Sequence, residues 1–180
     1  NVAIITNSGG PGILAADACD KLGLQLVPLH KEIVDQLRTF LPPFASFYNP
    51  VDILGDATAE RYEKALYTVV QDDKVNGILV LLTPTAVVDV EGTAKAIANI
   101  AHLIDKPILT SFMGRKSVES GSKILMKYHV PNYNYPEHAV SSFSAMYKYN
   151  VWIKRPEKVY PHFEGLKNKV NDIFESVKEE

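Results

Sequence analysis

The chain has 180 residues, of which 46% are hydrophobic, and a formal net charge of −2 at pH 7. This is enough to build one domain with a real core, alone or with a small appendage. The charge balance gives no reason to expect nucleic acid as a partner, and no apolar run reaches the length of a membrane span, so we expect no membrane partner either. The single cysteine, Cys19, cannot form an internal disulfide and suits a reducing compartment, which predicts a cytoplasmic protein.

The first 22 residues predict a strand, a glycine turn and a helix. The run Val2–Thr6 is short, apolar and rich in β-branched residues, which is typical of a parallel strand covered on both faces. The glycines of Asn7–Gly12 follow, and the alanine-rich segment Ile13–Leu22 predicts a helix, with Ser8 or Asn7 as its cap. Because Asn1 already stands at the start of a strand, we expect the chain to be a piece of something longer.

The glycine turn predicts an anion-binding site. Glycine leaves the backbone amides uncovered where the helix begins, and the helix dipole favours an anion there by about 0.3–2 kcal/mol. Gly10, Gly12 and Ala15 match the spacing of a dinucleotide-binding fold, but no acidic residue for a ribose occurs before Glu32. A P-loop is excluded, because no lysine follows the last glycine. The pattern favours a phosphate without a nucleoside; the alternative is that the glycines serve only tight packing.

Strands and helices alternate along the rest of the chain. Apolar runs predict further strands at 24–27, 78–83, 106–112 and 130–133. Helical periodicity predicts helices at 31–40, 59–71, 91–104, 118–128 and 136–149. Between them, 49–58 is an extended segment in which Thr58 caps the next helix, and in which Asp52 and Asp56 either reach a site or act as local caps. The pattern predicts an α/β fold: a doubly wound, flavodoxin-like parallel sheet of about five strands, with helices on both faces.

Residues 1–150 form the predicted domain, and 151–180 a linker and a charged helix, at 166–177, that leads towards a missing domain. Ligands of an open parallel sheet lie beyond the carboxyl ends of its strands, so Thr83–Thr85 is expected to share a rim with the glycine turn. Arg115 either meets an anion at that rim or is solvated at a helix start. The five histidines are scattered without metal-ligand spacing, so we expect no metal site.

Three stretches together resemble the NDP-forming acyl-CoA synthetases, the family of ADP-forming acetyl-CoA synthetase and succinyl-CoA synthetase. They are 2–12 with 15–18, 49–57 and 77–84, with weaker similarity at 106–108 and 135–139, in the order of the family. The chain is similar to the second flavodoxin-like CoA-ligase domain of these enzymes. The resemblance implies a reversible ligase that makes an acid, CoA and ATP from an acyl-CoA, ADP and phosphate, through an acyl phosphate and a phosphohistidine.

The resemblance also implies roles for individual residues. No catalytic residue is expected in this chain, because the phosphorylated histidine of the family lies in another domain. The residues expected to bind the phosphoryl group are Asn7, Ser8, Gly9, Gly10 and Gly12. Those expected on the adjoining acyl-phosphate side are Asn49, Asp52, Gly55, Thr83 and Pro84. In succinyl-CoA synthetase the loop equivalent to Thr83–Thr85 is glycine-rich, and the difference favours the acetyl-type branch.

Partners and cofactors follow from the same resemblance. The expected partners are the CoA-binding, first ligase and ATP-grasp domains of the same enzyme, together with small-molecule substrates. This domain alone is expected to bind no cofactor, whereas the parent enzyme uses ADP or ATP, Mg and CoA. Two alternatives remain: a stand-alone flavodoxin-like nucleotide- or phosphate-binding module, and a non-catalytic interaction domain. A receiver-type module would need clustered acids after the first strand, where Asn7 and Ser8 supply none.

Overall fold

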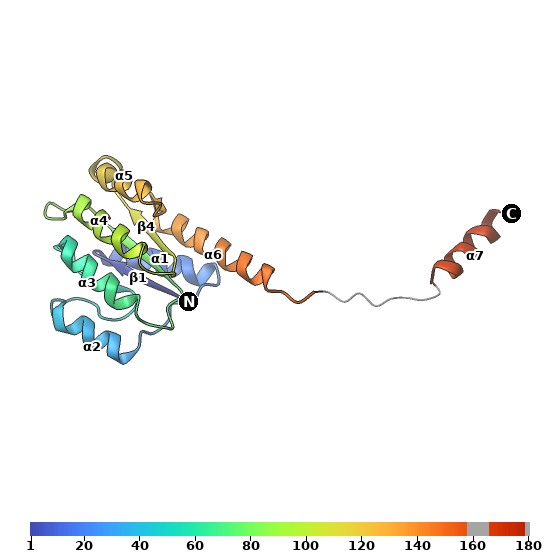
Figure 1. The fold of residues 1–180 in the computed structure, drawn as a ribbon, viewed down its shortest axis with the longest axis horizontal. Coiled ribbons are helices and arrows are strands. Elements are labelled where there is room, and N and C mark those ends of the chain that lie inside the picture. The colour runs from blue at the N-terminus through green and yellow to red at the C-terminus, as the bar shows by residue number, and fades with distance from the viewer. Residues whose placement is uncertain (158–165, 179–180) are drawn as a thin grey trace. The chain divides into compact units, whose positions relative to one another are not determined.

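The structure, a computed structural model, describes residues 1–157 and 166–178 and divides into two compact units, Asn1–Tyr149 and Asn150–Glu180 (Figure 1). Its strands are β1 (Val2–Thr6), β2 (Val51–Asp52), β3 (Gly77–Leu82), β4 (Ile108–Phe112) and β5 (Asn132–Tyr133). Its helices are α1 (Gly9–Lys21), α2 (Lys31–Phe40), α3 (Ala59–Val69), α4 (Val90–Ala101), the short 3-10 helix η1 (Arg115–Val118), α5 (Glu119–Lys127), α6 (Pro136–Ile153) and α7 (Leu166–Lys178).

The five strands form one parallel sheet in the order β2-β1-β3-β4-β5. This arrangement confirms the predicted doubly wound, flavodoxin-like α/β fold. The chain moves from β1 outward to β2 and then crosses back to β3 on the other side of β1. The strand order therefore reverses between β1 and β3, and ligands of such sheets bind beyond the carboxyl ends of the strands at this reversal.

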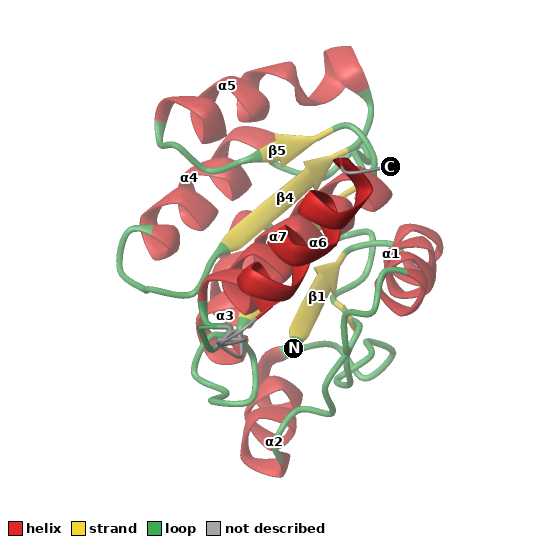
Figure 2. Cartoon of the chain, turned by 90° about the vertical axis from the view of Figure 1, so that its right-hand side faces the viewer, coloured by secondary structure: helices red, strands yellow, loops and turns green. Residues whose placement is uncertain are grey.

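Helices cover both faces of the sheet. One face packs in a core with residues of α2, α3, α4 and α5, which lie side by side in Figure 1, and the other packs against α1 and α6. Figure 2 views the sheet from the side of α6. Neighbouring residues of β1 point to opposite faces of the sheet: Ile5 packs in the core with α2 to α5, and Ile4 packs in the core with α1 and α6. Every residue of β1 and β3 is buried, which explains their continuous apolar sequence.

The predicted turn at 7–12 is shorter than expected, because α1 already begins at Gly9. The glycines therefore form the first helical turn instead of preceding it. Ser8 occupies the N-cap position, but its side chain makes no capping hydrogen bond. The hydroxyl of Thr6 takes part instead, accepting from the Ser8 N–H at 3.0 Å and donating to the Ser8 carbonyl at 2.8 Å.

The prediction of a strand at 24–27 is wrong. The segment makes only an isolated bridge between Leu26 and Val2, and β2 takes the position beside β1. The side chain of Asn49 explains the difference: its Oδ1 accepts from the Ile4 N–H at 2.9 Å, and its Nδ2 donates to the carbonyls of Val2 at 2.8 Å and Val27 at 3.0 Å. The side-chain amide of Asn49 thus forms hydrogen bonds with backbone groups that would otherwise pair with a neighbouring strand.

The second unit carries the end of α6 and all of α7. Helix α6 continues to Ile153, so the predicted linker begins later than residue 151, and the predicted extended segment at 160–161 lies outside the described residues. Helix α7 agrees with the helix predicted at 166–177. Of the helices that the structure describes, none combines the length and the apolar character needed to cross a membrane.

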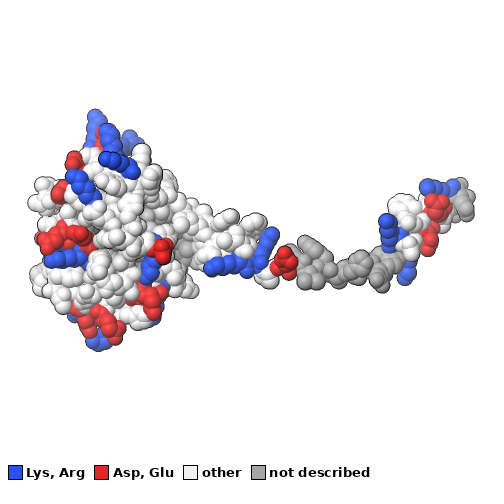
Figure 3. Space-filling model, viewed as in Figure 1, with Lys and Arg blue, Asp and Glu red and all other residues white. Residues whose placement is uncertain are grey.

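Charged side chains of both signs lie close together on the face drawn in Figure 3. Ion pairs within helices are also present: Lys31 pairs with Asp35 on α2, Lys64 with Glu60 on α3, and Lys123 with Glu119 on α5. Such exposed pairs are each worth about 0–1 kcal/mol of stability, so they have little effect on the fold.

Candidate functional site

The candidate site lies where β1, β2 and β3 end at the carboxyl edge of the sheet. Three connections meet there: the turn from β1 into α1, the loop 53–58 after β2, and the loop 83–89 after β3. They belong to segments far apart in the sequence. The parallel register of the three strands brings their ends to one edge.

Asn7 joins the ends of β1 and β3. Its Nδ2 donates to the Thr83 carbonyl at 2.8 Å, and its Oδ1 accepts from the Thr83 N–H, also at 2.8 Å. The side chain is almost fully buried. Since the amide is buried and bonded to Thr83 through both its oxygen and its nitrogen, Asn7 positions the two loops.

The start of α1 presents open backbone to solvent. Gly9 and Gly10 are exposed, and helix geometry leaves their N–H groups without an acceptor inside the helix. A Cβ placed on Gly10 would have no atom from another part of the chain within 4 Å. Gly12 differs, because it is buried and a Cβ there would lie 3.1 Å from Cγ2 of Thr6. Of the glycines predicted to bind an anion, Gly9 and Gly10 are therefore accessible, and Gly12 lets the helix approach the strand.

Asp52 and Gly55 lie beside this turn. One carboxylate oxygen of Asp52 accepts from the Leu54 N–H at 2.9 Å, and the other is 3.5 Å from the position of a Cβ on Gly9. Gly55 approaches the Asn7 carbonyl, and its own carbonyl accepts from the hydroxyl of Thr85 at 2.9 Å. The structure thus brings both predicted residues to the edge, with a carboxylate next to the helix N-terminus.

Thr83 and Pro84 complete the rim. The Oγ1 atom of Thr83 is buried and has no hydrogen-bond partner among the described residues. Pro84 packs against Gly114 in the loop after β4, where an added Cβ would lie 2.8 Å from Cγ of the proline. Asn49 does not join this group, because its side chain contacts the amino half of β1, as described above.

Arginine and burial set the electrostatics around the site. The Nη1 atom of Arg61 donates to the Ile53 carbonyl at 3.0 Å and pairs with Asp56, and this hydrogen bond lowers the pKa of the Asp56 carboxyl. Asp56 is therefore a partner of Arg61.

Burial raises the pKa of the Tyr62 hydroxyl well above its usual range, and that hydroxyl donates to the Leu81 carbonyl. Burial likewise raises the pKa of the Cys19 thiol to about 11, which does not suit a nucleophile.

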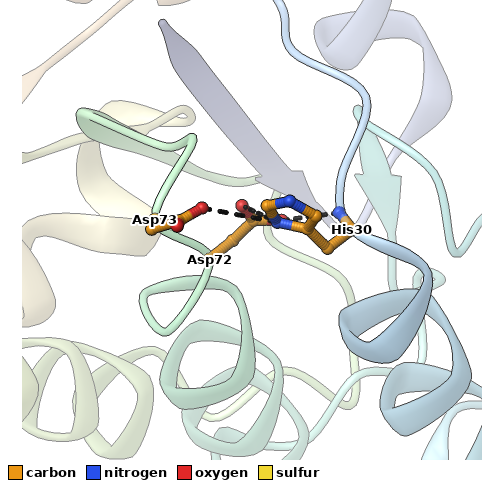
Figure 4. A group of neighbouring side chains, drawn as sticks. All are labelled: His30, Asp72 and Asp73. Atoms are coloured by element: carbon orange, nitrogen blue, oxygen red, sulfur yellow. Dashed lines mark hydrogen bonds and ion pairs between the residues drawn. The ribbon is translucent and has the colours of Figure 1, made fainter.

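The sequence analysis missed a cluster of His30, Asp72 and Asp73 (Figure 4). Nδ1 of His30 lies 2.9 Å from Oδ1 of Asp72 and 3.5 Å from Oδ1 of Asp73, within range of a shared metal ion. Asp72 already accepts from the backbone N–H groups of His30 and Lys74, so it fastens two loops at the amino edge of the sheet. His30 and Asp72 are 42 positions apart in the sequence, so rules based on short motif spacing do not detect this pair.

Comparisons with known proteins agree on one family. The family model described as the Ligase-CoA domain matches residues 2–156. An acetate–CoA ligase [ADP-forming] I of Archaeoglobus fulgidus is 42% identical over 150 residues, which cover 83% of this chain and 21% of that protein. A 4-hydroxybutyrate–CoA ligase [ADP-forming] of Nitrosopumilus maritimus is 31% identical over 180 residues, all of this chain and 26% of that protein.

A solved structure shows the same fold. The dinucleotide forming acetyl-coenzyme A synthetase 1 of Ca. Korarchaeum cryptofilum, in complex with phosphate and ADP, superposes with a TM-score of 0.80 at 29% identity. The match covers 88% of this chain and 36% of that one. The present chain therefore spans between about a fifth and a third of the length of these relatives.

Proposed function

Because the chain belongs to the Ligase-CoA domain family, we propose that it is one domain of an ADP-forming acyl-CoA synthetase. The whole enzyme converts an acyl-CoA, ADP and phosphate into the acid, CoA and ATP, and the reaction is reversible. One observation carries this proposal: the accessible start of α1 lies at the reversal of strand order, in a chain 42% identical to an ADP-forming acetate–CoA ligase.

In this proposal the first turn of α1 binds the phosphoryl group. The N–H groups of Gly9 and Gly10 and the positive end of the helix dipole stabilise its oxygens. Asn7 holds the turn against the end of β3, so the amides are oriented before the ligand arrives. A pre-organised donor spends no free energy on reorientation during phosphoryl transfer.

Asp52 belongs to the acyl-phosphate side of the proposed site, together with Gly55, Thr83 and Pro84. Its carboxylate repels a bare phosphate, because it lies next to Gly9. When the second ring nitrogen of a phosphorylated imidazole is protonated, its N–H donates to such a carboxylate, so the arrangement suits a protonated phosphohistidine better than free phosphate. The histidine itself comes from another domain in this proposal.

The remaining substrates have their main binding sites on other domains of the enzyme. We propose that CoA binds on a CoA-binding domain and that ADP or ATP, with Mg²⁺, binds on an ATP-grasp domain. The rim described here offers glycine amides, which suit a single phosphoryl group. The single buried cysteine, Cys19, fits a reducing compartment, so we place the enzyme in the cytoplasm.

The test compares the whole enzyme with the 180-residue chain. Each is incubated with ADP, phosphate and acetyl-CoA, and ATP is measured. We expect ATP from the whole enzyme and none from the chain, because the chain supplies only one wall of the site. ATP formation by the chain alone, or none by the whole enzyme with any acyl-CoA tested, would contradict the proposal.

A further inference from the structure

A cavity lies at the same edge of the sheet, beyond β4 and β5. It measures about 390 Å³ and is lined by Met113, Gly114, Arg115, Asn134 and Tyr135. The volume is within the range of small-molecule sites. None of these residues is among those assigned above to the phosphoryl group or the acyl-phosphate side.

Arg115 gives the cavity its charge. Among the described residues its guanidinium makes neither an ion pair nor a hydrogen bond, unlike Arg61, which has both. A guanidinium offers five N–H donors in a planar fork that matches a carboxylate or a phosphate. The cavity thus has an available partner for an oxyanion.

The backbone holds Arg115 in an unusual conformation. Its φ is 45° and that of Gly114 is 121°, so two consecutive residues have positive φ. Few residues other than glycine adopt this region. Ser117 fixes the turn, because its N–H and its hydroxyl both donate to the Gly114 carbonyl, at 3.2 and 2.9 Å. Strain of this kind persists where the surrounding structure imposes it, often at functional sites.

The position of the cavity restricts which anion it receives. Strands β1 and β4 are separated by β3, so their ends lie about 10 Å apart at the usual spacing of strands. The reacting carboxylate must lie within bonding reach of the phosphorus at the start of α1. A group bound in the cavity therefore lies at the end of a different strand from the reacting carboxylate.

We propose that the Arg115 cavity binds a remote, non-reacting oxyanion of a substrate, either a phosphate of CoA or the second carboxylate of a diacid. The choice of substrates rests on the proposed function. Arg115 is then a specificity residue: it strengthens the binding of one substrate and leaves the transfer step unchanged.

Kinetics of the whole enzyme test this proposal with Arg115→Gly and Arg115→Lys. Glycine accepts the positive φ, so the first variant removes the guanidinium without new strain. Lys116→Gln is the matched control, because Lys116 is the exposed neighbour and does not line the cavity. ATP formation is measured with varied acetyl-CoA, and the reverse reaction with varied CoA, acetate and succinate.

We expect Arg115→Gly to change the KM or the turnover of one substrate at least tenfold. A raised KM for CoA, with KM for acetate unchanged, identifies the phosphate source. A loss of succinate turnover relative to acetate identifies the diacid source. Arg115→Lys should retain part of the effect, and Lys116→Gln should behave like the wild type.

Unchanged constants for every substrate would overturn the proposal, and so would an equal fall in kcat for all of them with each KM unchanged. Failure of the proposed function would look different, because the wild-type enzyme would then form no ATP.

Discussion

Gly10 allows the proposed phosphoryl site to be tested by charge alone. No other part of the chain lies within 4 Å of a Cβ at this exposed position, so Gly10→Ala fits without a clash, and Gly10→Asn and Gly10→Asp start from the same open space. An acidic residue in the first turn stabilises a helix by about 0.3–1 kcal/mol. We therefore expect Gly10→Asp to be at least as stable as the wild type, which separates an effect on rate from misfolding.

The expected loss of rate in Gly10→Asp follows from Coulomb's law. Two unit charges about 5 Å apart interact by about 3 kcal/mol at an effective dielectric constant of about 20. Solvent screening at this exposed position lowers the repulsion to between about 1.4 and 2.7 kcal/mol, which is about a 10- to 100-fold change in rate. Asparagine has nearly the same shape and no charge, so Gly10→Asn and Gly10→Ala should stay within about threefold of the wild type.

The assay is single-turnover phosphoryl transfer to ADP by the whole enzyme, with thermal unfolding of each variant as the check on folding. A slow Gly10→Asp beside a fast Gly10→Asn would assign the loss to the carboxylate. Equal rates for Gly10→Asp and the wild type would refute the location of the phosphoryl group. Equally slow Asp and Asn variants would show that size, not charge, matters there.

Other predictions concern stability. Asn7→Ala leaves the N–H and the carbonyl of Thr83 unpaired, which costs about 1–3 kcal/mol for each group. Chemical denaturation should therefore show that the free energy of unfolding falls by about 2–6 kcal/mol. A fall below about 1 kcal/mol would contradict the role of Asn7 in joining β1 and β3. Thr58→Ala removes the cap that accepts from the Arg61 N–H and should cost about 1 kcal/mol, whereas a neutral result would show that water replaces it. Burial raises the pKa of Asp72, but hydrogen bonds from His30 and Lys74 lower it more, so the net shift is downward. A lowered pKa stabilises the fold above the unfolded value of about 3.9, and this contribution is lost as pH falls through the folded value. As the pH is lowered below about 4, the free energy of unfolding should therefore fall less steeply in Asp72→Asn than in the wild type. Equal slopes in the two proteins would count against a stabilising role of the Asp72 carboxylate.

The sequence predicted best what depends on local pattern. The continuous apolar runs of β1 and β3 are enough to predict strands covered on both faces, and the amphipathic run 31–40 has the same bounds as α2. The site edge was also predictable, because parallel strands bring the glycine turn and Thr83 together.

Side chains that bond across the chain were not predictable. Asn49 lies in an extended segment, and only the fold shows that its amide takes backbone groups of Val2, Ile4 and Val27 in place of a strand at 24–27. Asn7 looked like a ligand, but its amide is engaged with Thr83. The start of α1 was placed too late, because glycine is uncommon inside helices and usually marks a turn.

The most direct test of the central claim is the structure of the whole enzyme in its phosphorylated state. The account predicts a phosphohistidine from another domain, with phosphoryl oxygens about 2.7–3.2 Å from the N–H groups of Gly9 and Gly10. A phosphohistidine that never contacts the first turn of α1, in a structure where the present domain is fully ordered, would contradict it.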